Sequence, residues 1–252
     1  MPGRLRLWSH RWPRALADVL LPCSCALCGE RADDLVCMPC RERHAASGGA
    51  RCPCCANPLG AAEAAGQRCA SCLADVPEFD ATVAAVDYAA PLDALVLRLK
   101  FGAQLPLAPW FARRMLDAVL AQPGWPLPDL LCPVPLGPQR LVERGFNQAL
   151  EIARPLALSL GVALFPRLLV RSVETRAQSG VAPSERARNI RGAFEVPDDT
   201  PLRGRHVGVV DDVMTSGHTL NEIAATLRRA GAARVSNLVF ARTPPHGSSK
   251  TH

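Results

Sequence analysis

The chain has 252 residues, a hydrophobic share of 48% and a formal net charge of +6 at pH 7. This composition excludes an intrinsically disordered protein, and no run approaches the roughly 20 apolar residues that would predict a membrane span. One Tyr and seven Phe leave few aromatic side chains for stacking on bases, which argues against a single-stranded nucleic-acid surface built on aromatic platforms.

Ten of the eleven cysteines lie between Cys23 and Cys72, and this sharp boundary predicts two modules. Residues 1–22 carry charges throughout and have no long apolar core, so we expect no secretory signal and a cytoplasmic protein. Association with the inner face of the membrane is the alternative, because four Arg and two Trp fall within residues 4–14. In a reducing compartment, paired cysteines are more often metal ligands than disulfides.

The cysteine-rich segment carries four Cys-x-x-Cys pairs, a spacing that suits tetrahedral coordination of Zn²⁺ by thiolates. The predicted ligands are Cys25, Cys28, Cys37, Cys40, Cys52, Cys55, Cys69 and Cys72. Eight ligands predict two structural Zn²⁺ ions, and the spacing leaves open whether the pairs combine sequentially or in a cross-braced order. Redox pairs or an iron–sulfur cluster are the other interpretations, and Cys23 and Cys54 are left over.

After the cysteines, the apolar pattern alternates between strands and helices, which predicts an α/β fold with a parallel sheet. The predicted strands are residues 82–88, 130–135, 168–170, 193–196, 207–210 and 235–240. The predicted helices are residues 92–101, 107–120, 147–160 and 219–230, and we expect Pro155 to kink or divide the third. Residues 172–191 are polar and basic, which is typical of a long loop.

These patterns divide the chain into four parts. Residues 1–22 form a basic segment with a short helix, residues 23–78 the cysteine module, residues 79–243 the α/β domain, and residues 244–252 a disordered tail. We place the core of the α/β domain at residues 125–243.

The strongest functional signal lies in residues 209–219, where an apolar strand reaches Asp211 and Asp212 and a small polar turn then opens a helix. Open α/β sheets bind ligands at the carboxyl ends of their strands, and a helix amino terminus suits a phosphate. The acids are expected to accept hydrogen bonds from sugar hydroxyls. An ordinary capped turn explains one or two of the Ser and Thr residues, but not two acids at an apolar strand end.

This segment resembles the phosphoribosyl pyrophosphate (PRPP) loop of type I phosphoribosyltransferases. There an apolar strand is followed by two acids, an apolar pair and Thr-Thr/Ser-Gly-x-Thr. Together with the cysteine pairs, RLKFG at residues 98–102 and the segments 132–149 and 174–194, it makes the chain similar to the ComF family of competence-associated proteins. The resemblance covers about residues 20–242. It implies a type I phosphoribosyltransferase fold behind a double zinc ribbon in which the cysteines combine sequentially.

The resemblance also implies a site for PRPP with Mg²⁺. Its catalytic residues are Asp211, Asp212 and Arg176. Its binding residues in the PRPP loop are Asp211, Asp212, Val213, Met214, Thr215, Ser216, Gly217, His218 and Thr219. Donors to the pyrophosphate are expected from Arg140, Arg144 and Asn147, and a flexible hood would add Arg176, Gln178 and Arg186. For these last two groups the alternatives are plain surface charge and an unstructured basic loop.

Two functions of different classes remain open at this point. The first is an enzyme that transfers a 5-phosphoribosyl group from PRPP to an unknown acceptor and releases pyrophosphate. The second is a non-catalytic factor that binds single-stranded DNA or senses PRPP and works with a helicase partner. The resemblance implies a role in competence and in handling imported single-stranded DNA. We expect the basic residues 167–191, not the near-neutral cysteine module, to contact DNA.

Overall fold

The computed structural model describes residues 23–45, 49–60, 66–172 and 192–244. The chain forms two compact units, Met1–His44 and Ala45–His252. The second half of the cysteine module therefore belongs with the larger unit, while the boundary at residue 78 that the sequence suggests stays a prediction.

In the smaller unit, strands β1 (Cys23–Ser24) and β2 (Arg31–Ala32) pair in antiparallel fashion and precede helix α2 (Met38–His44). Among its described residues the buried apolar side chains are Cys25 and Val36. So small a core does not offset the conformational entropy lost on folding, and this unit needs another source of stability.

The larger unit is built on a five-stranded sheet with the strand order β3-β9-β8-β4-β5, in which every neighbouring pair is parallel. Its strands are β3 (Ala81–Asp87), β4 (Leu130–Pro133), β5 (Ala163–Leu164), β8 (His206–Met214) and β9 (Arg234–Arg242). This arrangement confirms the predicted parallel α/β fold. Because all five strands point the same way, their carboxyl ends meet at one edge of the sheet.

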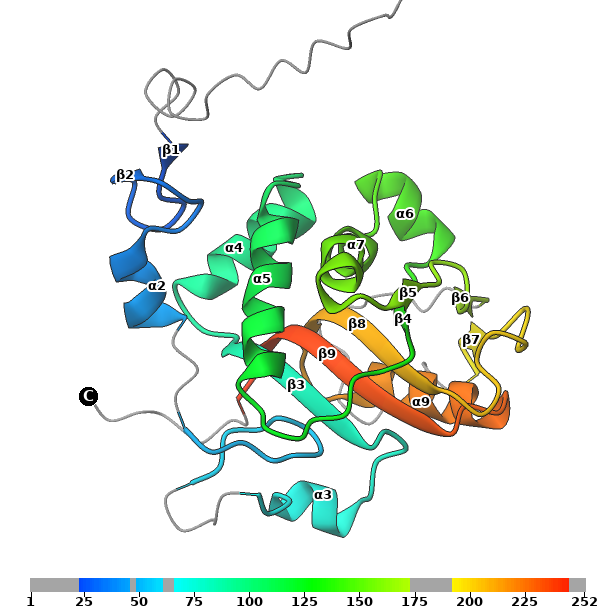
Figure 1. The fold of residues 1–252 in the computed structure, drawn as a ribbon. Coiled ribbons are helices and arrows are strands. Elements are labelled where there is room, and N and C mark those ends of the chain that lie inside the picture. The colour runs from blue at the N-terminus through cyan, green and yellow to red at the C-terminus, as the bar shows by residue number, and fades with distance from the viewer. Residues whose placement is uncertain (1–22, 46–48, 61–65, 173–191, 245–252) are drawn as a thin grey trace, which may run out of the picture. The chain divides into compact units, whose positions relative to one another are not determined.

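Helices cover both faces of this sheet (Figure 1). One face carries α4 (Leu92–Phe101), α5 (Leu107–Leu120) and α7 (Gln148–Leu160), and the other carries α9 (His218–Arg229). On the first face, Phe111 of α5 stacks on Phe240 of β9 with ring centroids 3.7 Å apart, and Trp110 meets both rings edge-on. All three side chains are fully buried.

Short elements complete the larger unit. They are α3 (Ala70–Ala74), α6 (Pro138–Arg144) and a two-stranded antiparallel ribbon of β6 (Val170–Arg171) and β7 (Phe194–Glu195). Helix α6 was not expected, because it is short and buries none of its residues; it starts at a proline and ends at Gly145 with φ of +77°.

Two further differences from the sequence-based expectations bear on the site. Pro155 does not divide α7, because Ile152 and Leu156 on either side of it are fully buried and hold the helix in place. Strand β8 runs on to Met214, four residues beyond its predicted end, so that both acids lie inside the strand. Among the described helices, none is both long and apolar enough to cross a membrane.

Candidate functional site

Asp211 and Asp212 lie near the carboxyl end of β8, where successive side chains point to opposite faces of the sheet. Asp212 is only 2% exposed, whereas Asp211 is half-buried. The two adjacent acids therefore have different surroundings, which the sequence alone does not predict.

Asp212 faces α4 and α7. Its Oδ2 atom lies 2.7 Å from Nζ of Lys100, the penultimate residue of α4. Its Oδ1 atom accepts a hydrogen bond from Nε2 of Gln148 at 3.4 Å, and Oε1 of Gln148 accepts one from Arg144. In this network the buried carboxyl group of Asp212 has two polar partners. Without them, a charge at this depth would be costly to bury.

Asp211 has no such cation of its own among the described residues. Although part of its surface reaches solvent, its carboxyl group is densely surrounded by protein. That burial, with the neighbouring Asp212 carboxylate, raises the pKa of Asp211 well above the ordinary value of 3.8. A carboxyl group whose ionisation is disfavoured at a strand end is typical of a functional site rather than of a stabilising one.

A cavity of about 520 Å³ adjoins this network, and residues of α4, α6 and the start of α7 line it. Three of its lining side chains are cations, namely Lys100, Arg140 and Arg144, and we call it the cationic cavity. The Arg144 guanidinium also lies 5.3 Å from the centre of the Phe101 ring, which is 75% exposed. The structure thus brings Lys100, Arg140 and Arg144 to one cavity, and Lys100 connects that cavity to Asp212.

Asn147 has a different part in this region. Its Oδ1 atom accepts hydrogen bonds from the backbone N–H groups of Ala149 and Leu150, and so caps the amino end of α7. Its Nδ2 atom donates to the carbonyl of Val134 at 3.0 Å. These bonds commit the Asn147 side chain to the local backbone.

The turn between β8 and α9, residues 215–217, presents the amino end of α9. Gly217 has φ of +85°, a left-handed conformation in which other residues are strained, so the position favours glycine. No side chain caps this helix, although Ser216 Oγ and His218 Nδ1 lie 3.0 Å apart. The N–H groups of the first turn consequently stay available for an anion.

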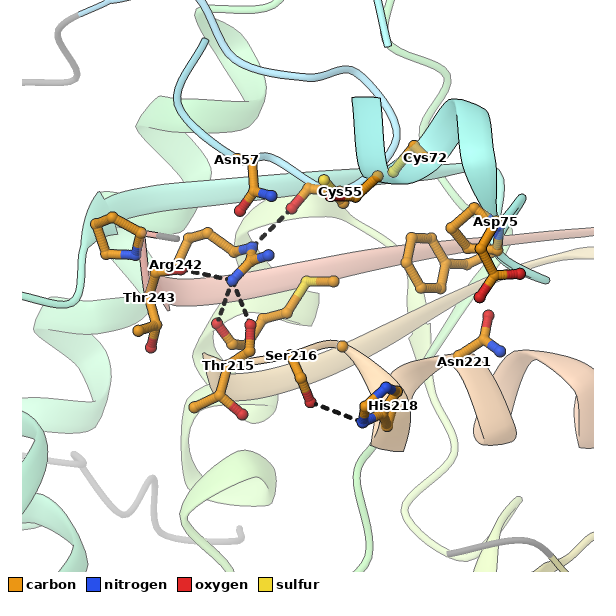
Figure 2. A pocket seen from close by; sticks show the side chains of 16 residues that line it. Cys55, Asn57, Cys72, Asp75, Thr215, Ser216, His218, Asn221, Arg242 and Thr243 are labelled. Atoms are coloured by element: carbon orange, nitrogen blue, oxygen red, sulfur yellow. Dashed lines mark hydrogen bonds between the residues drawn. The ribbon is translucent and has the colours of Figure 1, made fainter. Parts of the chain in front are cut away.

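Arg242, the last residue of β9, connects this turn to the second group of cysteines. It is 5% exposed; its Nε atom donates to the Cys55 carbonyl at 2.9 Å, and Nη1 donates to the carbonyls of Met214 and Thr215 (Figure 2). The backbone of the turn is therefore fixed from the cysteine side as well as from the sheet.

The eight predicted ligands form two tetrads, in which all sulfur atoms lie within 4.8 Å of one another. The members are Cys25, Cys28, Cys37 and Cys40 in the smaller unit, and Cys52, Cys55, Cys69 and Cys72 in the larger. This grouping is the sequential one that the resemblance implied, and the leftover Cys23 and Cys54 join neither tetrad.

The spacing of the sulfurs fits Zn²⁺. Ligands about 2.3 Å from a central ion lie about 3.8 Å apart in a regular tetrahedron. The Sγ atoms of Cys28 and Cys37 are 3.7 Å apart, and those of Cys55 and Cys69 are 3.6 Å apart. The tetrads can hold a structural zinc ion each, with no coordination position left for a substrate.

Backbone N–H groups point at one sulfur in each tetrad. Cys37 N donates to Cys25 Sγ and Cys69 N to Cys52 Sγ, both at 3.3 Å. Burial works to raise the pKa of these two thiols, but the backbone donors outweigh it and lower the pKa of Cys25 to about 6 and of Cys52 to about 7. The thiolate form that zinc requires is thus favoured at Cys25 and Cys52. The pKa of four other ligands is raised, so these must lose their protons when a metal binds; they are Cys28, Cys40, Cys55 and Cys72.

Several predicted residues, Arg176, Gln178 and Arg186, lie outside the described part of the chain. Conversely, Lys100 and Arg242 were not predicted as site residues. Lys100 lies in the RLKFG stretch, which contributed only to the resemblance, and Arg242 ends an otherwise apolar strand. In both cases the available signal was a positively charged residue at the end of an apolar helix or strand.

The comparisons with known families agree with this geometry. Residues 147–250 match the phosphoribosyl transferase domain family, and residues 16–76 match the double zinc ribbon domain family. The protein is therefore a double zinc ribbon joined to a phosphoribosyltransferase-type domain.

Relatives identify a narrower family. The chain is 38% identical over 195 residues to the DNA utilization protein YhgH of Salmonella typhi, an alignment that covers 76% of this chain and 84% of that protein. It is 33% identical over 180 residues to competence protein F of Haemophilus influenzae, covering 70% and 79% of the two chains. The chain belongs to this family of competence protein F and YhgH, which confirms the resemblance to ComF.

Among solved structures, the purine phosphoribosyltransferase of Pyrococcus horikoshii Ot3 is 20% identical to the chain, with a TM-score of 0.30. The match covers 55% of this chain and 73% of that one. A likeness this low supports no conclusion about the site.

We predict that the purified chain binds two Zn²⁺ ions, one in each tetrad. Elemental analysis of the chain measures this number directly. Cys52→Ser should lose one of the two ions, because it removes a ligand of the second tetrad. Cys54→Ser is the matched control and should keep both, since Cys54 is buried next to the tetrad without belonging to it. A chain with less than one Zn²⁺, or with an iron chromophore, would contradict the assignment.

We also predict that the two acids differ in what they do for stability. Because the pKa of Asp211 is raised in the folded chain, its ionisation costs stability as the pH rises from about 3.8 towards the raised value. Asp211→Asn should therefore be more stable than the wild type at neutral pH, with the difference disappearing in acid. Asp212→Asn should lose about 1–3 kcal/mol, since it leaves Lys100 without its partner. Urea unfolding at pH 4 and pH 7.5 measures both, and equal effects of the two substitutions would contradict the assignment.

Proposed function

We propose that the larger unit binds PRPP at the carboxyl end of β8. With Mg²⁺, it would transfer the 5-phosphoribosyl group of PRPP to an acceptor. The observation that carries this proposal is the cationic cavity beside Asp212, on the same strand that continues into the amino end of α9. Cations on one side of paired acids and free N–H groups on the other suit a ribose with a phosphate group at each end.

The 5′-phosphate would lie on the turn between β8 and α9. The first-turn N–H groups of α9 and the partial positive charge of its amino end favour an anion there. Gly217 allows the backbone to approach the phosphate closely, and the exposed hydroxyl groups of Thr215 and Ser216 add donors.

The ribose hydroxyls would donate to the Asp211 and Asp212 carboxylates, and the pyrophosphate would enter the cationic cavity. Lys100, which lies 2.7 Å from Asp212, would then be able to pair with either Asp212 or the pyrophosphate. A pyrophosphate would draw Lys100 away from Asp212, which leaves this carboxylate free to accept a ribose hydroxyl. The ion pair thus holds the Asp212 side chain in place until the ligand arrives.

In the transfer step, the bond between the ribose C1 atom and the pyrophosphate oxygen breaks, and C1 bonds to the acceptor nucleophile. The ribose gains positive charge at this stage, which the neighbouring Asp211 and Asp212 carboxylates stabilise. Bound with the pyrophosphate, Mg²⁺ would neutralise the charge that collects on the leaving group. Arg140 and Arg144 line the cavity that would receive this group.

A second candidate function is the binding of single-stranded DNA without catalysis, together with a helicase partner. The names of the relatives, DNA utilization protein and competence protein F, favour it. The same cations would then contact strand phosphates, and PRPP would act as a competing or sensed ligand.

We predict that PRPP with Mg²⁺ binds the full chain and that Lys100→Met weakens this binding by at least about tenfold, which corresponds to about 1.4 kcal/mol. Loss of the cation should affect PRPP more than ribose 5-phosphate, because only PRPP carries the pyrophosphate. Arg229→Met is the charge-matched control, since Arg229 lies at the carboxyl end of α9 and is 63% exposed. Calorimetric titration measures these affinities. If PRPP binds Lys100→Met and Asp211→Asn as tightly as the wild type, the proposed site is wrong.

For the second candidate, we predict that a labelled single strand binds the full chain and that PRPP displaces it. Contacts to phosphates should weaken steeply with salt, because each neutralised phosphate releases counterions. Fluorescence anisotropy between about 50 and 200 mM salt, with the wild type and Lys100→Met, measures this. A strand that stays bound at saturating PRPP would place its contacts outside the cationic cavity.

A further inference from the structure

The backbone of the turn between β8 and α9 is oriented by Arg242. The guanidinium donates through Nη1 to the carbonyl of Met214 at 3.2 Å and to the carbonyl of Thr215 (Figure 2). Because a peptide unit is planar and trans, each of these carbonyls points away from the N–H group of the following residue. The bonds from Arg242 therefore direct the N–H groups of Thr215 and Ser216 to the side opposite the guanidinium. Within the described part of the chain neither N–H group donates a hydrogen bond, so both are available for an anion.

The same guanidinium contacts the second tetrad. Its Nε atom donates to the Cys55 carbonyl at 2.9 Å, and the guanidinium also interacts with the Cys55 side chain. Cys69 and Cys72 attract its positive charge as well. One side chain thus connects three members of the tetrad to the turn.

A cavity of about 510 Å³ lies between the turn and this tetrad. Cys55 and Cys72 line it on one side, and Thr215 and Ser216 line it on the other. Figure 2 shows Arg242 at one end of the cavity, with hydrogen bonds to both sides. Because the cavity keeps the cysteines from packing directly on the turn at this place, the guanidinium makes the connection there.

The burial of Arg242 makes its position sensitive to the charge of the tetrad. The residue is 5% exposed, and a cation at this depth is costly unless negative charge compensates it. A tetrad that holds zinc carries a charge of about −2, and an empty one does not keep this charge. An empty tetrad also no longer fixes Cys55, whose carbonyl holds Nε. Both changes weaken the hold of Arg242 on the carbonyls of the turn.

We propose that Arg242 is a positioning residue that couples metal occupancy of the second tetrad to phosphate binding at the turn between β8 and α9. With the tetrad filled, Arg242 directs the N–H groups of Thr215 and Ser216 to the phosphate. With the tetrad empty, the turn loses this constraint and its affinity for a phosphate falls. The inference rests on the proposed function, because it takes the 5′-phosphate of PRPP as the anion, and it adds the regulation of that site.

The first test measures the affinity for PRPP with Mg²⁺ by calorimetric titration of full-length chains purified with Zn²⁺. Cys52→Ser removes a ligand of the second tetrad and should bind PRPP at least about tenfold more weakly than the wild type. Cys54→Ser is the matched control, because Cys54 is buried nearby without belonging to the tetrad, and it should keep the wild-type affinity. The Zn²⁺ content of each chain is measured alongside.

Arg242→Lys then tests whether the guanidinium makes the connection. Lysine keeps the positive charge but replaces the planar fork by a single nitrogen, which cannot bond to Cys55 and to the turn together. In this background, Cys52→Ser should change the affinity for PRPP by less than about twofold, the usual scatter between independent substitutions. If Cys52→Ser still weakens PRPP binding about tenfold there, the metal acts by another route and the proposal is overturned. A purely structural role of Arg242 would leave the effect of Cys52→Ser unchanged.

The unmutated chain provides a second measurement. Coupling between two sites is reciprocal, so a phosphate on the turn should tighten metal binding in the second tetrad. Ribose 5-phosphate is the probe, because it lacks the pyrophosphate that would itself bind zinc. At a saturating concentration of this probe, removal of one of the two ions should require at least about tenfold more of a zinc chelator. Equal release of both ions with and without the probe would overturn the proposal.

Failure of this inference can be distinguished from failure of the proposed function. If neither PRPP nor ribose 5-phosphate binds the zinc-loaded wild type, the phosphate site of the proposed function fails, and this inference fails with it. If PRPP binds the wild type and the zinc-depleted Cys52→Ser chain equally tightly, the proposed function stands and the coupling through Arg242 is overturned.

Discussion

The larger unit depends on one buried cation, Arg242. Its guanidinium ties the Cys55 carbonyl to the carbonyls of Met214 and Thr215, and so joins the cysteine segment, the end of β9 and the turn before α9. Burial lowers the pKa of Arg242, and the sulfurs of the second tetrad counter this effect. A zinc ion with four thiolates carries a charge of about −2, which compensates a cation that would otherwise be costly to bury. The second tetrad and the turn before α9 therefore share their electrostatics as well as their backbone contacts.

The two acids of β8 differ in what they contribute to the stability of the fold. Asp212 is paired with Lys100 and contributes to the fold, whereas burial and its neighbour raise the pKa of Asp211 and make its ionisation unfavourable. A fold selected for stability alone would not place a second carboxyl group there. The unfavourable ionisation of Asp211 is explained if a ligand offsets it by donating hydrogen bonds to both carboxylates.

The two cysteine tetrads have different roles in the two units. In the smaller unit, the tetrad supplies the stability that its few buried apolar side chains cannot provide. In the larger unit, Cys52, Cys55, Cys69 and Cys72 are all buried within the hydrophobic core that also contains residues of the sheet and α9. The second tetrad therefore shapes the wall of a cavity next to the proposed phosphate site.

The sequence by itself determined the features that depend on neighbouring residues. The Cys-x-x-Cys spacing identified the eight cysteines of the two tetrads, apolar periodicity located α4 and α5 at their observed bounds, and residues 209–219 marked the end of β8. Only the tertiary structure decided which distant groups meet. Lys100 reaches Asp212 across 112 positions, and Arg242 reaches Cys55 across 187. Such pairs leave no local pattern, because packing of α4 against α5 and of the cysteine segment against the end of β9 brings them together.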